Sequence, residues 1–515
     1  MAYHHGVRIL EAPTSIVAPV TGTAGLQVVF GTAPVNLSED PYNVTNKPVI
    51  AYSFAEAVAQ LGYSDNFKDY TLCQSIDATF RVLNVAPIIM INVLDPTKHK
   101  KKNAAARISV EDMQAKVPYL GILSDKIVVT VPGETTEAGA AEGTDSGDGL
   151  DLDGDPVPAE PAAVDGALVQ GTDYVVTFDD EGYAIINLYA TGAGAEAAEL
   201  VVESTSIDPT AVTWKDIVGG YNVSTGEETG LELIRQIYPR FAMTPGLILA
   251  PGWSHIPNVA AVIGAKCTDI NGMFSCECVL DVDTTQVRKY TDVLAWKNSN
   301  GYTNKRSALL WPMIKVGEKQ YAYSAIFAAL TAYTDVQNDD IPVQSPSNIL
   351  TSVTGTVLDD GTEVYLDKEQ GNLLNSQGVI TAINLTGWRT WGNRTAVYPA
   401  ETDPKDMWFC CRRFFSWWGN SFILTYFQKV DRPMTRQLVE NIIDQENIRG
   451  NSYVARNKCA GARIEYLEEE NPITDIVNGK LAFHQYLAPW VPAEDIVNTL
   501  EFDPQMLQDA LYGGE

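Results

Sequence analysis

Long apolar runs are missing from this chain of 515 residues. No stretch approaches the roughly 18 consecutive apolar residues that a membrane-spanning helix needs, so the sequence predicts no direct membrane insertion. The N-terminus also lacks a basic region followed by an apolar stretch, which is the pattern of a secretory signal. We therefore expect a protein that is made and folded in the cytoplasm.

Histidine and the sequence signatures of catalysis are scarce as well. The five histidines are scattered along the chain. No nucleophile elbow, phosphate-binding glycine loop or zinc-protease motif occurs, and the glycines of 192–197 lack the third glycine of a dinucleotide fingerprint. We therefore expect no enzyme and no cofactor, and we assign no catalytic, cofactor-binding or metal residues. An α/β enzyme with an unrecognised site stays open as an alternative.

The seven cysteines have no spacing that is typical of a disulfide framework. Cys276 and Cys278 lie in an apolar segment with Cys267 nearby, but a fourth metal ligand is not evident. Cys410 and Cys411 are neighbours in an aromatic-rich segment. We interpret all five as packed side chains, because free cysteine behaves as a small apolar residue.

Positively charged residues are few: the chain has 36 Lys and Arg but 65 Asp and Glu, which gives a net charge of −29. Nucleic-acid binding needs a basic footprint, so we expect no nucleic-acid partner. Much of the acidity lies in residues 133–171, which contain neither lysine nor arginine. Asp151, Asp153 and Asp155 alternate there, but the glutamate that completes an EF-hand loop is absent. This segment is predicted to be a solvated outer loop that folding does not need.

Strand and helix patterns alternate over much of the remaining sequence. Ser53 and Glu56 have the spacing of a capping box, which predicts a helix start. Helices are also expected over 255–266 and 321–336, each after an apolar strand. Around the acidic loop, short β-rich runs instead follow one another with turn residues between them. This arrangement predicts a β-rich domain inserted into a discontinuous α/β domain.

The expected fold class is therefore a mixed α/β (α+β) multidomain protein with a strand-like arm at each end. Its expected parts are an N-terminal arm (1–22), a discontinuous α/β domain (23–105 and 226–375), an inserted acidic β-rich outer domain (106–225), a C-terminal α+β domain (376–493) and a C-terminal arm (494–515). In the C-terminal domain we interpret 407–428 as an aromatic core helix with Arg412 and Arg413 at its polar edge, followed by a helix over 433–448.

Each terminal arm contains a strand pattern without an obvious partner in the chain. The N-terminal pattern is bounded by Gly6 and Pro13, and the C-terminal one is close to strict alternation and stops at Pro504. A lone strand leaves backbone groups unpaired along both edges and is not stable by itself. The predicted arm strands comprise Val7, Arg8, Ile9, Leu10 and Glu11 at one end, and Ile496, Val497, Asn498, Thr499, Leu500, Glu501 and Phe502 at the other.

Several segments of the sequence resemble the tail sheath proteins of contractile bacteriophage tails and related bacteriocins. GVRILEAP at 6–13 looks like the N-terminal arm of that family, and PAEDIVNTLEFDP at 492–504 resembles its closing strand. GWRTWGNRT at 387–395 is similar to the family's Gly-x-Arg-x-Trp-Gly-x-Arg-Thr signature. CRRFF at 411–415 resembles its Arg-Arg helix, and AYTDVQNDDIPVQSPSN at 332–348 resembles a loop of the family.

The resemblance implies a structural subunit of a contractile tail sheath, which polymerises around an inner tube and contracts to drive the tube through a target cell envelope. It implies a homo-oligomer of stacked rings, in which the arms add strands to neighbouring subunits. The implied partners are the inner tail tube protein and the baseplate and tail terminator proteins. Assembly would take place in the cytoplasm of a bacterial host, and the product would be a virion tail or a contractile bacteriocin. Another self-assembling shell or tube protein is the structural alternative.

The resemblance also implies that the C-terminal domain (376–493) lies nearest the tube. Basic side chains lie on the helix predicted at 433–448 and on its flanks, in an otherwise acidic chain. They could contact an acidic tube, and a solvated helix face is the equally open alternative. These candidate tube contacts are Arg432, Arg436, Arg449, Arg456 and Lys458.

Overall fold

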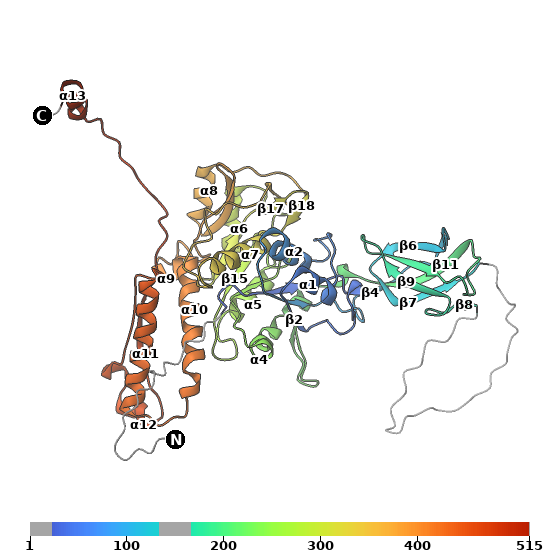
Figure 1. The fold of residues 1–515 in the computed structure, drawn as a ribbon, viewed down its shortest axis with the longest axis horizontal. Coiled ribbons are helices and arrows are strands. Elements are labelled where there is room, and N and C mark those ends of the chain that lie inside the picture. Colours follow the sequence, from blue (N-terminus) through green and yellow to red (C-terminus); the bar gives the residue numbers. More distant parts are fainter. Residues whose placement is uncertain (1–22, 133–165, 514–515) are drawn as a thin grey trace, which may run out of the picture.

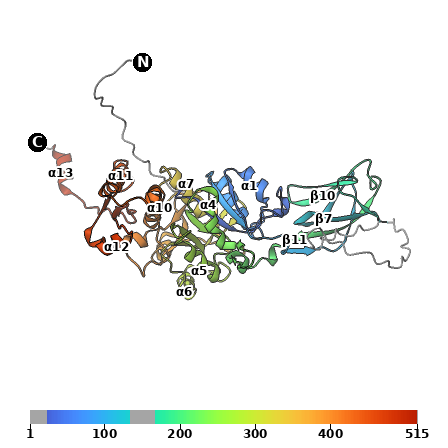
Figure 2. The same cartoon turned by 90° about the horizontal axis from the view of Figure 1, so that it is seen from below.

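The computed structural model describes residues 23–132 and 166–513. A sheet-and-helix body lies at the centre, a β-rich part extends from one end of it, and long helices stand at the other end (Figures 1 and 2). The predicted N-terminal strand at 7–11 and the alternating aspartates at 151–155 lie outside the described residues. The expected mixed α/β fold class is confirmed by this combination of sheets and helices.

The body is built on one eight-stranded sheet with the order β2-β3-β1-β14-β15-β16-β20-β21. Its inner strands run parallel, and β2 and β21 pair antiparallel at the two edges. The strands are β1 (Gln27–Gly31), β2 (Pro48–Ala51), β3 (Ile88–Asn92), β14 (Leu247–Leu249), β15 (Glu277–Asp281), β16 (Ser307–Leu310), β20 (Val379–Asn384) and β21 (Trp388–Trp391). The sheet thus continues past residue 376, where we expected the C-terminal domain to begin.

Helices cover this sheet and complete its apolar core. Helix α7 (Tyr323–Val336) is almost wholly buried and packs against β1, β14 and β15. The helices predicted at 255–266 and 321–336 are confirmed as α5 and α7. The helix start predicted at Ser53 is also confirmed, but the reciprocal bond of a capping box is not formed, because the Glu56 carboxylate accepts from the Tyr52 N–H and not from that of Ser53. The other helices of the body are α1 (Phe54–Leu61), α2 (Leu72–Asp77), α3 (Trp214–Val218), α4 (Ile237–Phe241), α5 (Pro257–Lys266), α6 (Val293–Ser299) and α8 (Lys368–Asn375).

Two small sheets also belong to the body. They are the hairpin β12 (Gly220–Tyr221) with β13 (Glu228–Thr229), and a sheet of β17 (Met313–Val316), β18 (Lys319–Tyr321) and β19 (Gly355–Val357).

The β-rich part projects from the body and has an apolar core of its own. It consists of two sheets with the orders β6-β10-β9 and β4-β11-β7-β8, and β5 also pairs with β11. The strands are β4 (Lys100–Lys102), β5 (Ala106–Ser109), β6 (Gln114–Leu120), β7 (Ile122–Thr130), β8 (Ala167–Leu168), β9 (Tyr174–Phe178), β10 (Tyr183–Leu188) and β11 (Glu199–Ile207).

One correction concerns the acidic segment 133–171. We expected all of it to be a solvated loop, but its last residues form β8, which pairs with β7. Leu168 is buried in the core of the β-rich part, and Asp173 caps the turn that follows by accepting the Val169 N–H at 2.7 Å. Residues 133–165 are outside the described residues, so the prediction of a solvated loop stays a prediction for them.

The far end of the molecule is a layer of helices beside a two-stranded sheet. Helix α10 carries the aromatic residues, and its Phe414, Trp417 and Trp418 pack with Tyr453 of α11, which confirms the core-helix interpretation. The elements are α9 (Pro404–Met407), α10 (Phe409–Tyr426), α11 (Arg436–Ala455), β22 (Gly461–Glu465), α12 (Ile473–Val477), β23 (His484–Ala488) and α13 (Pro504–Tyr512). Among the described residues, no helix combines the length and apolar character needed to cross a membrane.

Candidate functional site: the C-terminal arm and its root

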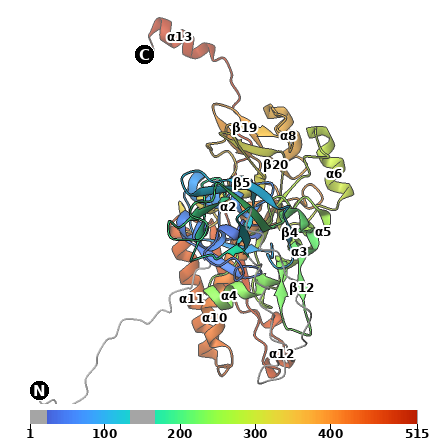
Figure 3. The ribbon, with the colours of Figure 1, turned by 90° about the vertical axis from the view of Figure 1, so that its right-hand side faces the viewer.

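The C-terminal arm leaves the body as an extended segment and ends in helix α13 (Figures 1 and 3). Residues 496–502, predicted as a strand, pair with no strand and make no hydrogen bond within 23–132 and 166–513. Their large apolar side chains face solvent: Leu500 is 88% exposed and Ile496 is 85% exposed. The arm therefore adds nothing to the core of its own subunit, and its pairing as a strand stays a prediction.

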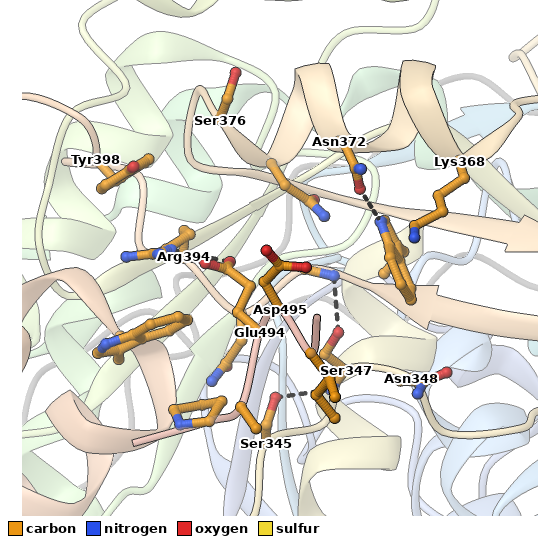
Figure 4. A pocket seen from close by; sticks show the side chains of 18 of the residues that line it. Ser345, Ser347, Asn348, Lys368, Asn372, Ser376, Arg394, Tyr398, Glu494 and Asp495 are labelled. Carbon is orange, nitrogen blue, oxygen red and sulfur yellow. Dashed lines mark hydrogen bonds and ion pairs between the residues drawn. The ribbon is translucent and has the colours of Figure 1, made fainter. Parts of the chain in front are cut away.

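A cavity of about 840 Å³ lies where the arm joins the body (Figure 4). Residues 391–394 of the signature segment line it, together with the loop 344–348, helix α8 and the first arm residues, 492–496. Three segments that carry the family resemblance are far apart in the sequence and meet at this point. Asn372, Ser347 and Arg394 are among the polar side chains that line it.

Arg394 holds the root of the arm against the body. Its Nε–H donates to Oε1 of Glu494 at 3.1 Å, and a second N–H donates to the other carboxylate oxygen. The guanidinium also lies over the ring of Trp408 at 3.6 Å from the centroid and over that of Tyr398 at 4.4 Å. Such a two-pronged ion pair sandwiched by aromatic faces is a geometry that arginine provides and lysine does not.

Other residues of the signature segment shape the wall of the cavity. Gly392 has φ +122°, and a Cβ atom there would lie 2.4 Å from the side-chain oxygen of Asn375, so only glycine fits. The Gly392 N–H donates to Ser347 Oγ at 2.9 Å, and Arg389 donates to the carbonyl of Asn348 at 3.1 Å. The signature therefore ties the loop 344–348 to the edge of the central sheet.

Arg412 and Arg413 are not at a polar edge of α10, as we had predicted, but buried. Arg413 makes a bidentate ion pair with Asp335 of α7 and donates to the carbonyl of Ala24 at 2.8 Å. Arg412 pairs with Asp406 at 2.9 Å. The reason for the error is that each arginine meets a buried carboxylate outside its own helix: Asp335 comes from a distant part of the sequence, and Asp406 lies six residues before Arg412 in α9. Burial raises the pKa of the Asp335 carboxyl, and the adjacent Arg413 opposes that rise.

Helix α10 is joined to the central sheet by a second buried ionic group. Glu277 of β15 accepts from Arg306 at 3.0 Å and from Ser416 of α10 at 2.6 Å. Burial raises the pKa of the Glu277 carboxyl, and the charges of Arg306 and Arg412 oppose this. The helical layer and the central sheet are thus connected by desolvated, geometrically specific contacts, which resist sliding of one against the other.

The two-stranded sheet of β22 and β23 has an edge with no partner. Ile464 of β22 exchanges both backbone hydrogen bonds with the side chain of Asn447 in α11, at 3.0 and 3.2 Å. The outer edge of β23 pairs with no strand in the described part of the chain. Because unpaired strand edges are templates for another strand, β23 is open to a strand from outside the subunit.

The candidate tube contacts do not form one cluster. Arg449 is buried, pairs with Glu446 and lies over the ring of Trp418. The prediction of a tube contact is therefore wrong for this residue, whose side chain stabilises the packing of the helical layer. Arg456 and Lys458, beyond the carboxyl end of α11, both pair with Asp339, at 3.9 and 3.2 Å. The remaining two candidates are Arg432 and Arg436.

Arg432 and Arg436 lie at the amino end of α11, and a helix of 20 residues is about 30 Å long, so they are far from Arg456 and Lys458. Arg436 is strongly exposed and pairs with Glu440 at 2.7 Å. These two side chains are available to a partner, and contact with a tube stays a prediction.

The cysteines that had suggested a metal site are packed in the core. Cys267, Cys276 and Cys278 are all buried, and the Cys276 N–H donates to the carbonyl of Cys267 at 3.0 Å. Within the described ranges, no group of three or more His, Cys, Asp or Glu side chains is arranged to hold a metal ion. Cys410 and Cys411 are buried beside Trp408 and Met407, as interpreted from the sequence.

No family model matches the chain. The tail sheath protein of Burkholderia phage BcepMu is 24% identical over 526 aligned positions, which cover 99% of this chain and 99% of that protein. The putative prophage major tail sheath protein of Pseudomonas aeruginosa is 26% identical over 62% of this chain and 78% of its own length. Among solved structures, the PVC sheath complex of an extracellular contractile injection system, in its contracted state, matches with a TM-score of 0.55 at 12% identity, covering 98% of this chain and 99% of that one.

These likenesses cover the sequence from end to end and agree with the resemblance carried by the arm, the signature and the Arg-Arg helix. The solved structure shares the fold, and the sheath protein of phage BcepMu aligns over 99% of both chains. Over its whole length the chain is thus similar to a phage tail sheath protein, and its fold is that of a contractile sheath subunit.

Proposed function

We propose that this protein is a structural subunit of a contractile tail sheath and not an enzyme. It polymerises around an inner tube and contracts to drive the tube through a target cell envelope. The observation that carries the proposal is a mismatch within one subunit: among the described residues, the apolar arm pairs with no strand and β23 has an open edge. A second copy of the chain supplies what each of them lacks.

The link between subunits is strand addition. Residues 496–502 of one subunit pair with the open edge of β23 in another, so main-chain hydrogen bonds give affinity and alternating side chains set the register. Each net hydrogen bond contributes about 1 kcal/mol, and burying Leu500 or Ile496 contributes about 2 kcal/mol each. The donor and acceptor surfaces differ, so the contact is heterologous and propagates into an open helical polymer instead of closing as a dimer. The arm strand predicted at 7–11 is expected to add a further link of the same kind.

Contraction requires one subunit to pack in two ways. The buried pair between Arg413 and Asp335 and the buried hydrogen bond from Ser416 to Glu277 join the helical layer to the body, which favours movement of the two as one unit. The extended arms then keep neighbours connected while the bodies repack into the lower-energy array. The pair of Arg394 with Glu494 sets the direction in which the arm departs.

The inner tube would be met by the helical layer. Arg432 and Arg436 are the two candidate tube contacts that are exposed at the amino end of α11, and they would dock on an acidic tube surface. Reversing both charges should weaken co-assembly with the tube protein and reduce its dependence on salt, because screened ion pairs are lost. Co-assembly that is unchanged at every salt concentration would instead assign both to a solvated helix face.

Subunits in the terminal rings would meet the baseplate and the tail terminator. The assembled particle is then a virion tail or a contractile bacteriocin.

Electron microscopy of the purified full-length chain in negative stain tests the proposal. Striated hollow cylinders are expected in the micrographs. Sedimentation of the same sample should show assemblies of matching size. Closed shells would favour the other class of self-assembling protein. Discrete particles of one subunit at every concentration would contradict the proposal and return attention to an α/β enzyme.

A further inference from the structure

Helix α13 at the end of the arm presents an apolar face that no other segment of 23–132 or 166–513 covers. Asp503 caps it by accepting the Gln505 N–H at 2.8 Å. Met506, Leu507 and Leu511 fall on one side of the helix by their spacing and are all exposed, Leu511 at 70%. A helix of nine residues is marginal in water by itself, so this one gains its stability by docking.

An apolar groove of about 290 Å³ opens at the carboxyl end of α10. Its floor and walls come from α10, α4 and the turn before β15, and Phe427 at its mouth is 62% exposed. Apolar helix faces commonly bind in grooves of this kind through side chains at helical spacing. The apolar lining consists of Tyr238, Met273, Phe274, Ile423, Leu424 and Phe427.

The charges beside helix and groove are complementary. The chain contains no lysine or arginine after Lys480, and Asp509 flanks the apolar face of α13. Arg240 and Lys429, each two residues from a side chain that lines the groove, have no ion pair within the described part of the chain. A helix carrying an acidic side chain would supply their missing counter-charge.

The groove also lies next to the strand edge that accepts the arm. Gln485 of β23 donates to Glu446 at 2.9 Å, and the hydroxyl of Tyr426 donates to the same carboxylate at 3.2 Å. Tyr426 directly precedes Phe427 at the mouth of the groove. An arm strand on β23 is therefore followed, after Asp503, by a helix that begins close to the groove.

The arm of the same subunit starts at the opposite end of α10. Its root is held by Arg394 beside Trp408, the residue before α10, whereas the groove lies at the end of this helix of 18 residues, about 27 Å away. In Figure 1 the arm points away from that end. We propose that α13 of one subunit docks its apolar face into the groove between α10 and α4 of a second copy, locking the strand link in place. This inference rests on the proposed sheath function.

Disulfide trapping in assembled cylinders tests the contact. The full-length double variant Leu511→Cys/Phe427→Cys is assembled, oxidised with copper phenanthroline and run on a non-reducing gel. A ladder of covalently linked subunits is expected, because each subunit joins the next. The native cysteines are all buried and should not contribute to the ladder.

The matched control is Gln505→Cys/Phe427→Cys, since the helical spacing places Gln505 opposite the centre of the face formed by Met506, Leu507 and Leu511, and this variant should give little or no ladder. Cylinders without a ladder from the Leu511 variant would overturn the docking while leaving the sheath function intact. A fast-migrating intrachain product would also overturn it, because α13 would then occupy its own groove. A chain that forms no cylinders at all, with or without the substitutions, would contradict the sheath function and the docking together.

Discussion

Replacing Leu500 with proline separates the role of the arm in assembly from its role in folding. Leu500 is 88% exposed and touches no core, so we expect the free energy of unfolding of the monomer to change by less than about 0.5 kcal/mol. In the polymer, proline removes a backbone donor from the middle of a paired strand, which costs about 1 kcal/mol or more. It also removes most of the buried leucine side chain, which costs about 2 kcal/mol.

The sum is about 3 kcal/mol for each link, which corresponds to a loss of roughly a hundredfold in its association constant. Since every subunit donates one such arm, the concentration at which cylinders appear should rise by a similar factor. Sedimentation over a concentration series, with electron microscopy of the pellets, measures this shift, and circular dichroism reports the fold. Ile9→Pro and Leu10→Pro should act in the same direction from the N-terminal arm, which lies outside the described residues.

Leu500→Val is the matched control, because it keeps the backbone donor and a β-branched apolar side chain, and it should assemble like the parent protein. Cylinders of normal length at an unchanged critical concentration in the proline variant would refute strand addition by this arm. Loss of the monomer's circular dichroism signal would also refute the reasoning, because it would mean that the arm supports its own subunit.

Three further predictions concern the body. Arg413→Met should lower the free energy of unfolding by about 3–5 kcal/mol in urea titrations, because Asp335 is left buried and unpaired. Adding Asp335→Leu to this variant should recover much of the loss. Equal losses in the single and double variants would contradict the pairing. Burial and the nearby Asp335 raise the pKa of Asp340 from 3.8 to about 7, so the folded state loses stability as the pH rises through that range. Asp340→Asn should therefore stabilise by about 2 kcal/mol at pH 8 and by little at pH 4, and a pH-independent effect would exclude this origin. Replacing 134–165 by a short Gly-Ser joint should leave solubility and polymerisation intact in sedimentation assays, and insoluble protein would refute the view that the segment is dispensable.

Features set by neighbours in the chain were accessible from the sequence. Ser53 Oγ accepts the Glu56 N–H at 3.2 Å at the start of α1, three residues apart, and the helix ends at Gly62 as its local chemistry predicts. The apolar pattern of 321–336 likewise predicted α7. The exposure of the arm at 496–502 could also be predicted from its sequence. These residues make no hydrogen bond or strand pair within the described part of the chain, so no distant segment changes what the local pattern indicates.

Features set by contacts between distant segments were not accessible. From the sequence, Arg413 was predicted at the polar edge of its helix, but in the structure it is paired with Asp335 of α7. Arg449 was predicted to be available to a tube, but it is enclosed by Glu446 and Trp418. Leu168 was predicted to lie in a solvated loop, but it belongs to a strand that pairs with β7.

The sequence by itself thus determined the local elements, the absence of a basic footprint and the exposed alternating pattern at 496–502. The tertiary structure alone decided which charges are buried, where the central sheet ends and that the arm root, the signature and the loop 344–348 share one cavity. The physical reason is that a helix cap or an amphipathic pattern is completed within a few residues, whereas burial of a charge depends on a partner whose place only the packed chain defines.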